Sequence, residues 1–266
     1  MRLSERCGRA TALAGVLVAG CGVHSLDAGT PGTGGGAGTG VVDIWPPMIS
    51  DFEDIAGATV VQQGSPPMNG YWYAYDDGSL GCNQIPRVGD PYRGEPPPTL
   101  RQGTSGALAL HAVWKACETW GAGVGADINV PVDWDGGIYT GPRQPYDWSA
   151  YPGLTFWAMA TPGTDISLRF KVVMRASARI EDGGLCDETV VGANKCGDEW
   201  GQNLSLPANG TWKQFTIKFA SASFHQEGWG APFKWDPRDV VGIQIQSVDA
   251  GLEYDFWLDD MYLLSQ

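Results

Sequence analysis

Long apolar runs and helical patterns are missing from this sequence of 266 residues. No apolar run reaches the roughly 20 residues that a membrane-spanning helix requires, and no stretch of helical apolar periodicity exceeds two turns. These absences favour a fold built from strands.

Catalytic and metal-binding motifs are equally scarce. The three histidines, His24, His111 and His225, are too scattered for a histidine metal site, and neither C-x-x-C nor G-x-S-x-G occurs. A glycosidase needs two carboxylates that face each other across the scissile bond. Five acidic residues could supply them, but none stands in a recognisable catalytic frame: Glu181, Asp182, Glu188, Glu199 and Glu227. A lyase that uses Tyr and Arg has no sequence frame and stays an alternative.

Basic residues are few, with 17 Lys and Arg against 30 Asp and Glu and a net charge of −13. This charge argues against nucleic acid and against docking on anionic lipid, because both are polyanionic. It suits neutral polysaccharides and bound cations, although acidity also supports solubility alone.

The first residues have the pattern of an export signal. Arg2, Arg6 and Arg9 precede a short apolar run at 10–20, as in a secretory signal peptide. The run ends at L-V-A-G-C, which resembles the lipobox of bacterial lipoproteins and implies cleavage after residue 20 and lipidation of Cys21. Gly22 follows, where lipoproteins retained at the inner membrane often carry Asp. We therefore expect a lipid anchor in the cell envelope, at the outer membrane; the alternative is an ordinary signal peptide with a chance cysteine.

Three segments follow from composition. Residues 1–20 form the signal peptide, and residues 21–47 form a Gly-, Thr- and Pro-rich tether that buries too little apolar surface to fold. Residues 48–266 are one domain's worth of chain, which we expect to be monomeric.

Strand signals recur through that domain. Ile166–Met174 alternates apolar and polar side chains, and similar runs occur at 108–114, 154–160, 215–219, 241–245 and 254–264. Gly, Pro, Asn and Asp clusters separate them, which predicts an all-β, two-sheet antiparallel β-sandwich. Several strands carry long polar side chains on their outward face, which is either a solvated face or a groove that binds sugar hydroxyls: Arg169, Lys171, Arg175, Gln244 and Gln246.

Four cysteines remain after Cys7 and Cys21 are set aside, in an oxidising compartment. Cys186 and Cys196 bracket a short loop, so we pair them, which leaves Cys82 with Cys117. A zinc site is the alternative.

The aromatic content is high, with 12 Trp and 9 Tyr. Sugar rings pack their C–H faces on aromatic rings while their hydroxyls need polar partners. On a strand, Tyr71, Tyr73 and Tyr75 share one face and Trp72 takes the other. This pattern predicts Trp72 in the core and Tyr73, Tyr75 and Asp76 on a binding surface, with burial in the core as the alternative for each ring.

Several motifs occur in an order that resembles the galactose-binding-like jelly-roll sandwiches of carbohydrate-binding modules, nearest to the β-glucan-binding modules of family eleven and to tethered myxobacterial lipoproteins. They are D-F-E-D at 51–54, W-Y-A-Y-D-D-G at 72–78, W-G-A-G-V-G at 120–125, Y-P-G-L-T-F-W-A at 151–158, G-G-L-C at 183–186, C-G-D-E-W-G at 196–201, W-K-Q-F-T-I-K-F at 212–219, G-W-G at 228–230 and F-W-L-D-D at 256–260. The resemblance implies a concave sheet that takes a glucan chain and a structural Ca²⁺ remote from it. Relatives often read C-x-D-H-F-G where this chain has Glu199 and Trp200, which puts the sugar specificity in doubt.

The calcium ligands we expect are Asp51, Glu53 and Asp260. The first two point to one face of the first strand, and Asp259 and Asp260 lie in the closing strand, which such sandwiches place alongside the first. Clustered carboxylates repel each other unless a cation neutralises them; edge charges placed against aggregation are the alternative.

Together these patterns predict a non-catalytic module that binds β-glucan-like polysaccharide. Tyr73, Tyr75 and Asp76 are the first candidates for the binding site, followed by Arg169, Arg175, Asp198 and Trp200. The rival functions are a polysaccharide lyase or glycoside hydrolase on the same sandwich and a protein-binding surface adhesin.

Overall fold

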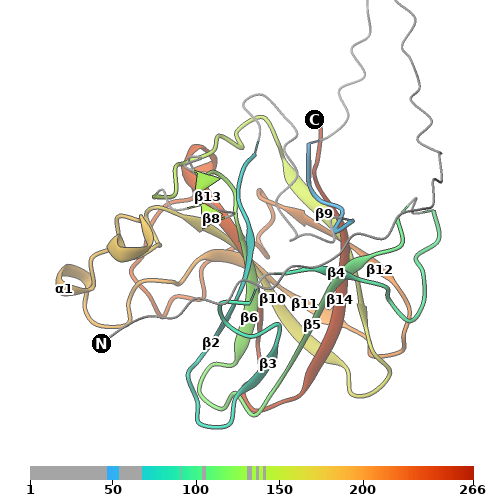
Figure 1. Ribbon diagram of the computed structural model, residues 1–266. Helices are drawn as coiled ribbons and strands as arrows, with labels where there is room; N and C mark the ends of the chain where they lie inside the picture. Colours follow the sequence, from blue (N-terminus) through green and yellow to red (C-terminus); the bar gives the residue numbers. More distant parts are fainter. Residues whose placement is uncertain are drawn as a thin grey trace, which may run out of the picture. The chain divides into compact units, whose positions relative to one another are not determined.

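The computed structural model describes residues 47–53, 68–90, 92–103, 106–130, 134–135, 138–139 and 142–266 (Figure 1). The predicted signal peptide, Cys21 and the tether up to residue 46 lie outside these ranges. In the part of the chain that is described, no helix is long and apolar enough to cross a membrane.

Two antiparallel sheets make up the domain. The five-stranded sheet has the order β11 (Trp200–Leu206), β10 (Ile166–Met174), β13 (Val240–Ser247), β6 (Ala122–Asp127) and β2 (Trp72–Asp76). The seven-stranded sheet runs β12 (Lys213–Lys218), β9 (Gly153–Ala160), β14 (Tyr254–Leu263), β5 (Ala109–Lys115) and β3 (Asn83–Ile85), with β1 (Met48–Ser50) on β14 and β4 (Gly94–Glu95) on β5. The smaller elements are the pair β7 (Trp134–Asp135) and β8 (Ile138–Tyr139), the helix α1 (Glu188–Val191), and the 3-10 turns η1 (Ile180–Asp182) and η2 (Pro237–Asp239). The predicted antiparallel β-sandwich is confirmed.

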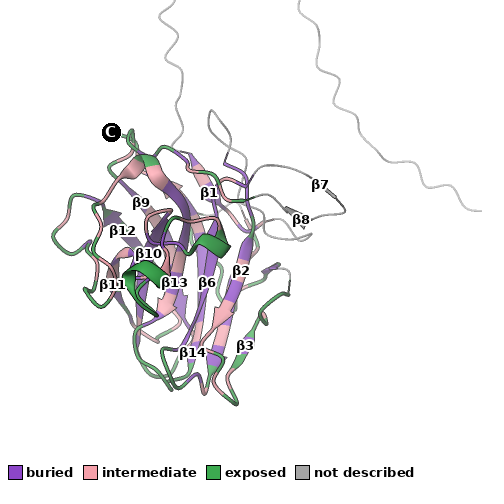
Figure 2. Ribbon diagram, turned by 90° about the vertical axis from the view of Figure 1, so that its left-hand side faces the viewer, coloured by how far each residue is buried: buried purple, intermediate pink, exposed green. Residues whose placement is uncertain are grey.

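The core lies between the two sheets. Alternate residues of each strand point inward, so apolar side chains from both sheets meet in one layer. Trp114 and Phe256 from the seven-stranded sheet and Phe170 and Ile243 from the five-stranded sheet are fully buried there. Trp72 is 3 % exposed and belongs to the same cluster, as the sequence predicts. In Figure 2 the strands are largely buried, whereas α1 is exposed.

The predicted strands are found close to their expected limits, with two exceptions. The first strand, β1, ends at Ser50, so Asp51 and Glu53 follow it and do not share one of its faces. The second exception is a strand that differs in its surroundings. Ile166–Met174 is predicted to be half-buried, with its polar face in solvent. In the structure Arg169 and Lys171 on that face are 3 % and 7 % exposed. The cause is that two connecting segments, 177–199 and 227–229, cover this face. Residues from these segments, which we call the roof, line a cavity over it.

Both predicted disulfides are present, Cys82–Cys117 and Cys186–Cys196. The predicted neighbourhood of the first and last strands is also confirmed, because β1 pairs antiparallel with β14.

Candidate functional site

A cavity of about 1090 Å³ lies on the outer face of the five-stranded sheet. Strand register puts its floor residues into two cross-strand rows. One row is Tyr75, Gly123, Gln246 and Arg169, and the next is Tyr73, Gly125, Gln244 and Lys171. Each row therefore runs from an aromatic ring on β2 to a basic side chain on β10.

The tyrosines lie over glycines of the neighbouring strand. A Cβ at Gly123 would come within 2.5 Å of the Tyr75 ring, and one at Gly125 within 2.6 Å of the Tyr73 ring. Only glycine allows this approach, since any side chain would collide with the ring. The ring centroids of Tyr71 and Tyr73 are 6.4 Å apart and those of Tyr73 and Tyr75 are 6.0 Å apart, which makes a continuous aromatic strip along β2.

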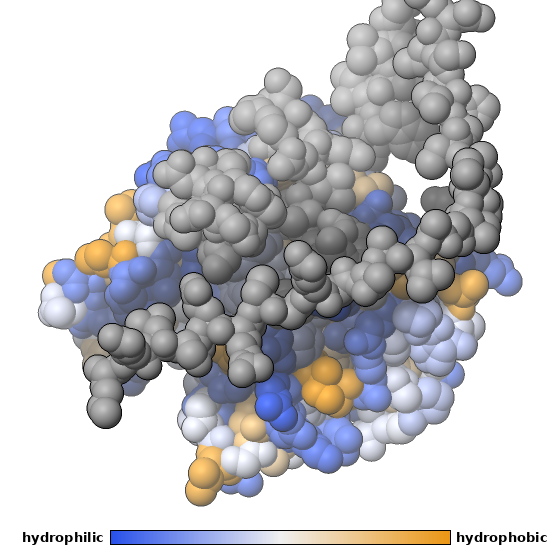
Figure 3. All heavy atoms as spheres, in the orientation of Figure 1, coloured by the Kyte–Doolittle hydropathy of each residue, from blue (hydrophilic) through white to orange (hydrophobic). Residues whose placement is uncertain are grey.

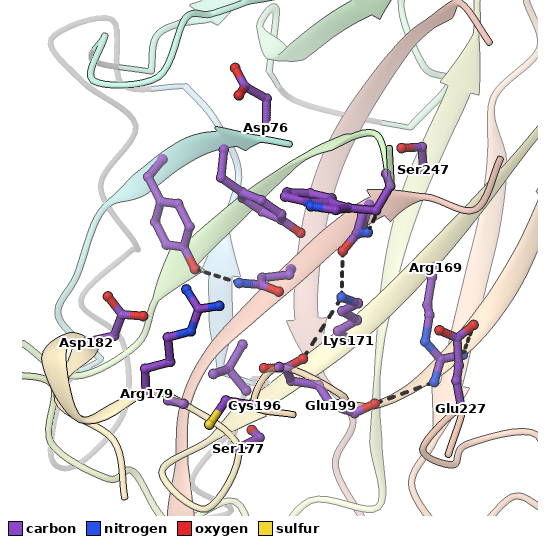
Figure 4. Close-up of a pocket in the computed structure, with 18 of the residues that line it drawn as sticks. Asp76, Arg169, Lys171, Ser177, Arg179, Asp182, Cys196, Glu199, Glu227 and Ser247 are labelled. Carbon is purple, nitrogen blue, oxygen red and sulfur yellow. Dashed lines mark hydrogen bonds and ion pairs between the residues drawn. The ribbon is translucent and has the colours of Figure 1, made fainter. Parts of the chain in front are cut away.

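A buried ion pair forms the centre of the polar half (Figure 4). Lys171 Nζ donates a hydrogen bond to Gln246 Oε1 at 2.5 Å and lies 3.9 Å from Glu199 Oε2. Burial raises the pKa of Glu199, and the charge of Lys171 partly opposes this rise. Burial lowers the pKa of Lys171, and the charge of Glu199 partly opposes this fall.

Arg169 ties the sheet to the roof. Its guanidinium donates to Asn203 Oδ1 at 3.0 Å and to the His225 carbonyl at 2.6 Å, and it lies 3.8 Å from Glu227 Oε1. Figure 4 shows Arg169 and Glu227 side by side at one end of the cavity. This network holds the guanidinium in place before any ligand arrives.

A third ion pair lies at the tyrosine end. Arg143 Nε is 3.2 Å from Asp127 Oδ1. Burial raises the pKa of Asp127 to about 6, although the Arg143 charge acts to lower it.

Three buried polar atoms of residues that line this cavity make no hydrogen bond to any described residue: the Tyr75 hydroxyl, Asp127 Oδ1 and Glu199 Oε2. The two carboxylate oxygens form the ion pairs with Arg143 and Lys171, whereas the Tyr75 hydroxyl has no such partner among the described residues. Buried polar groups are nearly always hydrogen-bonded, because an unpaired one loses its water without compensation. The Tyr75 hydroxyl is therefore a candidate for contact with a ligand.

The structure separates the predicted binding residues into two groups. Tyr73, Tyr75, Asp76 and Arg169 line the cavity, together with Lys171, Gln244 and Gln246 of the predicted polar face.

The remaining candidates, Arg175, Asp198 and Trp200, do not line it. Arg175 lies beyond the end of β10 and pairs with Asp239 at 2.5 Å. Trp200 is opposite Val172 in the register, so it packs against the core. Asp198 accepts hydrogen bonds from backbone N–H groups of the 227–230 loop.

Sequence reasoning did not assign several cavity residues to binding because they come from loops or precede a strand, among them Trp120, Arg143, Glu199, Glu227 and Trp229. The two tryptophans are each followed by glycine, but this is not a specific signal, because Trp200 is followed by glycine as well and packs against the core.

The predicted calcium ligands are placed near one another but are already engaged. Arg101 forms ion pairs with both Asp259 and Asp260. Glu53 accepts hydrogen bonds from the backbone N–H groups of Ala107 and Leu108. Burial is the main reason why the pKa of Asp259 is raised to about 6. Arg101 acts to lower this pKa, and the charges of Glu53 and Asp51 add to its rise.

These carboxylates do not converge as metal ligands do. Among the described residues, the group whose ligand atoms all lie within 4.8 Å of one another is Asp77, Cys82 and Cys117, and its two cysteines form a disulfide. In this arrangement the cation of the Asp259–Asp260 cluster is the Arg101 guanidinium, and Ca²⁺ there stays a prediction.

Comparison with known proteins gives similarity to solved structures alone. No family model matches the sequence, and no curated protein does. A family 11 carbohydrate-binding module from Clostridium thermocellum, in complex with a β-1,3-1,4-mixed-linked tetrasaccharide, is 13 % identical over 82 % of this chain and 95 % of that chain, with a TM-score of 0.45. A family 30 carbohydrate-binding module of a cellulosomal cellulase from the same organism is 13 % identical over 84 % and 99 %, with a TM-score of 0.44. An exo-β-agarase is 12 % identical over 82 % of this chain and 25 % of that chain, with a TM-score of 0.46.

Proposed function

We propose that this protein binds an uncharged polysaccharide of the β-glucan type in the cavity on its five-stranded sheet, without catalysing a reaction. The observation that carries the proposal is the pair of floor rows. Each row sets a tyrosine ring beside amide and basic side chains on one face. A pyranose ring presents both a C–H face and hydroxyls, so it can use both halves of a row at once.

The buried Tyr75 hydroxyl, which makes no hydrogen bond to a described residue, supports a ligand rich in hydroxyls. A hydroxyl donates one hydrogen bond and accepts others. A sugar hydroxyl can therefore accept a hydrogen bond from the Tyr75 hydroxyl, which relieves the cost of leaving that group unpaired.

The charges of the cavity favour an uncharged ligand. Basic and acidic side chains are nearly balanced in its lining, which contains Arg143, Arg169, Lys171 and Arg179 with Asp76, Asp127, Asp182, Glu199 and Glu227. Three of the basic groups are already paired with carboxylates. A polyanion would have to break these pairs, whereas a neutral glycan does not.

One observation favours an enzyme as the second candidate. Glu199 is 4 % exposed, lines the cavity with Glu227, and has its pKa raised by burial, as a general acid of a glycoside hydrolase does. Against this, Glu199 lies beside Lys171, and Glu227 accepts a hydrogen bond from Trp229 Nε1 at 3.2 Å. A catalytic carboxylate pair has to leave the scissile bond between its members, and these contacts turn each carboxylate toward the protein.

A protein-binding adhesin has less support on the face drawn in Figure 3. Outside the grey atoms, apolar side chains there form separate small groups in a mainly hydrophilic surface. Protein-binding surfaces of soluble domains usually contain a larger continuous apolar patch.

Affinity electrophoresis through gels that contain mixed-linkage β-glucan, xylan, agarose or alginate tests the proposal. We expect retardation by one of the neutral polymers and none by alginate, with no release of reducing ends from any of them. Retardation by none would overturn the function, and release of reducing ends that Glu199→Gln abolishes would establish the enzyme instead.

We also propose that Cys21 anchors this module to the cell envelope, on the sequence pattern alone. Cys21→Ser should release the protein from the membrane fraction or leave it unprocessed. A variant that is processed and still partitions with membranes would overturn the anchor.

A further inference from the structure

Two loops at opposite edges of the five-stranded sheet share a sequence pattern and an exposed ring. Residues 120–122 and 229–231 both read Trp-Gly-Ala. Trp120 is 42 % exposed and Trp229 is 43 % exposed, and both line the cavity. They are the exposed tryptophans among those whose burial the structure describes. An exposed tryptophan that lines a cavity offers a large, rigid and free stacking surface.

The first loop is fixed by Asp77. Its Oδ2 accepts hydrogen bonds from the backbone N–H groups of Thr119, Trp120 and Gly121 at 2.7, 3.1 and 3.0 Å. Burial acts to raise the pKa of Asp77, but hydrogen bonds from Ser79 and from this loop outweigh it and hold the pKa well below its ordinary value. The carboxylate is therefore charged, and charge-assisted hydrogen bonds are the stronger kind.

The second loop is fixed in the same way by Asp198. Its Oδ1 accepts from the backbone N–H of Glu227 at 2.9 Å, and its Oδ2 accepts from Gly228 and Gly230 at 2.8 and 3.0 Å. A Cβ at Gly230 would lie 2.3 Å from Asp198 Cβ, so the loop can approach the carboxylate only with glycine there. Asp198 is 2 % exposed, which places it beneath the loop rather than in the cavity.

Both rings are oriented before a ligand arrives. The Trp120 ring lies 6.0 Å from the Tyr75 ring at an interplanar angle of 31°, which continues the aromatic strip of β2. Trp229 is held by the bond from its Nε1 to Glu227 Oε2, and Lys195 Nζ donates to its carbonyl at 2.5 Å.

The rings of Trp120 and Trp229 lie at different edges of the five-stranded sheet. Trp120 stacks beside the edge strand β2, whereas the Trp229 loop joins the edge strand β11 through the bridge between Gly201 and His225. β10, β13 and β6 separate these edges (Figure 2), and neighbouring strands are about 4.8 Å apart, so the edges are roughly 19 Å apart.

We propose that Trp120 and Trp229 are two preset stacking platforms, one at each end of the cavity, and that Asp77 and Asp198 are the positioning residues that set them. The proposal rests on the proposed function. It identifies the ligand as an oligosaccharide long enough to reach from β2 to β11, laid across the strands. Fixing both rings in advance avoids the entropic cost of ordering them on binding.

Calorimetry of the full chain with mixed-linkage β-glucan oligosaccharides of increasing length tests the platforms. Affinity should rise with length until both rings are engaged. Trp120→Ala and Trp229→Ala should each weaken binding of the longest oligosaccharide about tenfold and flatten the length dependence. Leu185→Ala, an exposed apolar change that does not line the cavity, is the matched control and should leave affinity unchanged.

Double-mutant cycles test the positioning residues. Asp77→Asn should weaken binding in the unmutated background and add little once Trp120→Ala is present, and Asp198→Asn should be coupled in the same way to Trp229→Ala. The crossed pairs should be additive, because distant sites act independently. General destabilisation by either Asp change would not produce this pairing of effects.

The outcomes separate this proposal from the function on which it rests. If the unmutated chain binds a glucan and both Trp variants bind equally well, the platforms are overturned and the sugar-binding function stands. If the Trp variants lose affinity but all four Asp–Trp pairs are additive, the positioning role is overturned. If no glucan binds the unmutated chain, both proposals fail. The exposed Trp variants keep the platforms testable even where an Asp variant fails to fold.

Discussion

The outer faces of the two sheets carry the same kinds of side chain and differ in what lies above those side chains. On the five-stranded sheet, tyrosines, amides and ion pairs surround a cavity. On the seven-stranded sheet, His111 stacks on Trp257 at 3.9 Å and lies within 3.3 Å of Glu95 and 2.9 Å of Asp255.

Loops close the second face. Trp212 Nε1 donates to the Thr99 carbonyl at 2.7 Å, and Arg101 lies 5.0 Å from the ring centre of Trp157. Residue type alone therefore does not mark a binding face, whereas room above the sheet does.

Aromatic truncation should give the largest difference between the faces. Trp257 is 6 % exposed, so Trp257→Ala should lower the free energy of unfolding by about 3–5 kcal/mol and leave glucan affinity intact in the folded fraction. Tyr75→Ala should lower affinity about thirtyfold, a loss of about 2 kcal/mol at a binding hot spot, with a smaller change in the melt. Urea unfolding and calorimetry measure the two effects, and identical signatures for both variants would remove the distinction.

Removing an arginine from the face of the seven-stranded sheet should sharpen the comparison. Arg101→Ala leaves the carboxylate of Asp259, which is 3 % exposed, without its partner, and such a loss costs about 3–5 kcal/mol. We expect a lower melting temperature and unchanged glucan binding. Lys213→Ala, an exposed change on the same sheet, is the control. A melt unaltered by Arg101→Ala would show that the pair contributes nothing to stability.

The strand pattern was the predictable part of this molecule. Apolar alternation follows from burial of one strand face, so β10, β12 and β14 are found near their predicted limits. The disulfides were predictable because four cysteines allow few pairings. Tyr73 and Tyr75 were predictable because side chains alternate across a strand.

The roof of the cavity was not predictable. Glu199, Trp120 and Trp229 reach the cavity through loop paths that no local pattern specifies. The assignment of Asp198 as a ligand contact missed its backbone partners, since hydrogen bonds to the 227–230 loop depend on how two distant segments meet.

Calcium is a case in which the sequence and the structure predict different results. A Ca²⁺ bound to the native state alone would stabilise it by about 2.7 kcal/mol at a hundredfold excess over Kd, and EDTA would then lower the melting temperature. The contacts of Arg101 with Asp259 and Asp260 predict an unchanged melt. A melt lowered by EDTA, restored by Ca²⁺ and insensitive to both in Asp260→Ala would establish the metal site.

The closed face should also give a modest pH dependence. Asp259 has a pKa of about 6 in the fold against an ordinary value of 3.8, so the folded state binds the proton more tightly. Its contribution is fully present below the ordinary value and is lost as the pH rises through about 6. The free energy of unfolding of the unmutated chain, relative to that of Asp259→Asn, should therefore fall by an amount on the order of 2 kcal/mol from pH 4 to pH 7. A constant difference would contradict the buried setting of this carboxyl group.

The most direct test of the binding face is a titration of the ¹⁵N-labelled full chain with a β-1,3-1,4-linked glucose oligosaccharide, followed through the backbone and the tryptophan indole N–H signals. We predict shifts at Tyr73, Tyr75, Gln244 and Gln246 and at the indoles of Trp120 and Trp229, with the indoles of Trp212 and Trp257 unmoved. Shifts confined to the Trp212 and Trp257 side, or no shifts at millimolar sugar, would contradict the assignment of the five-stranded face as the glycan-binding surface.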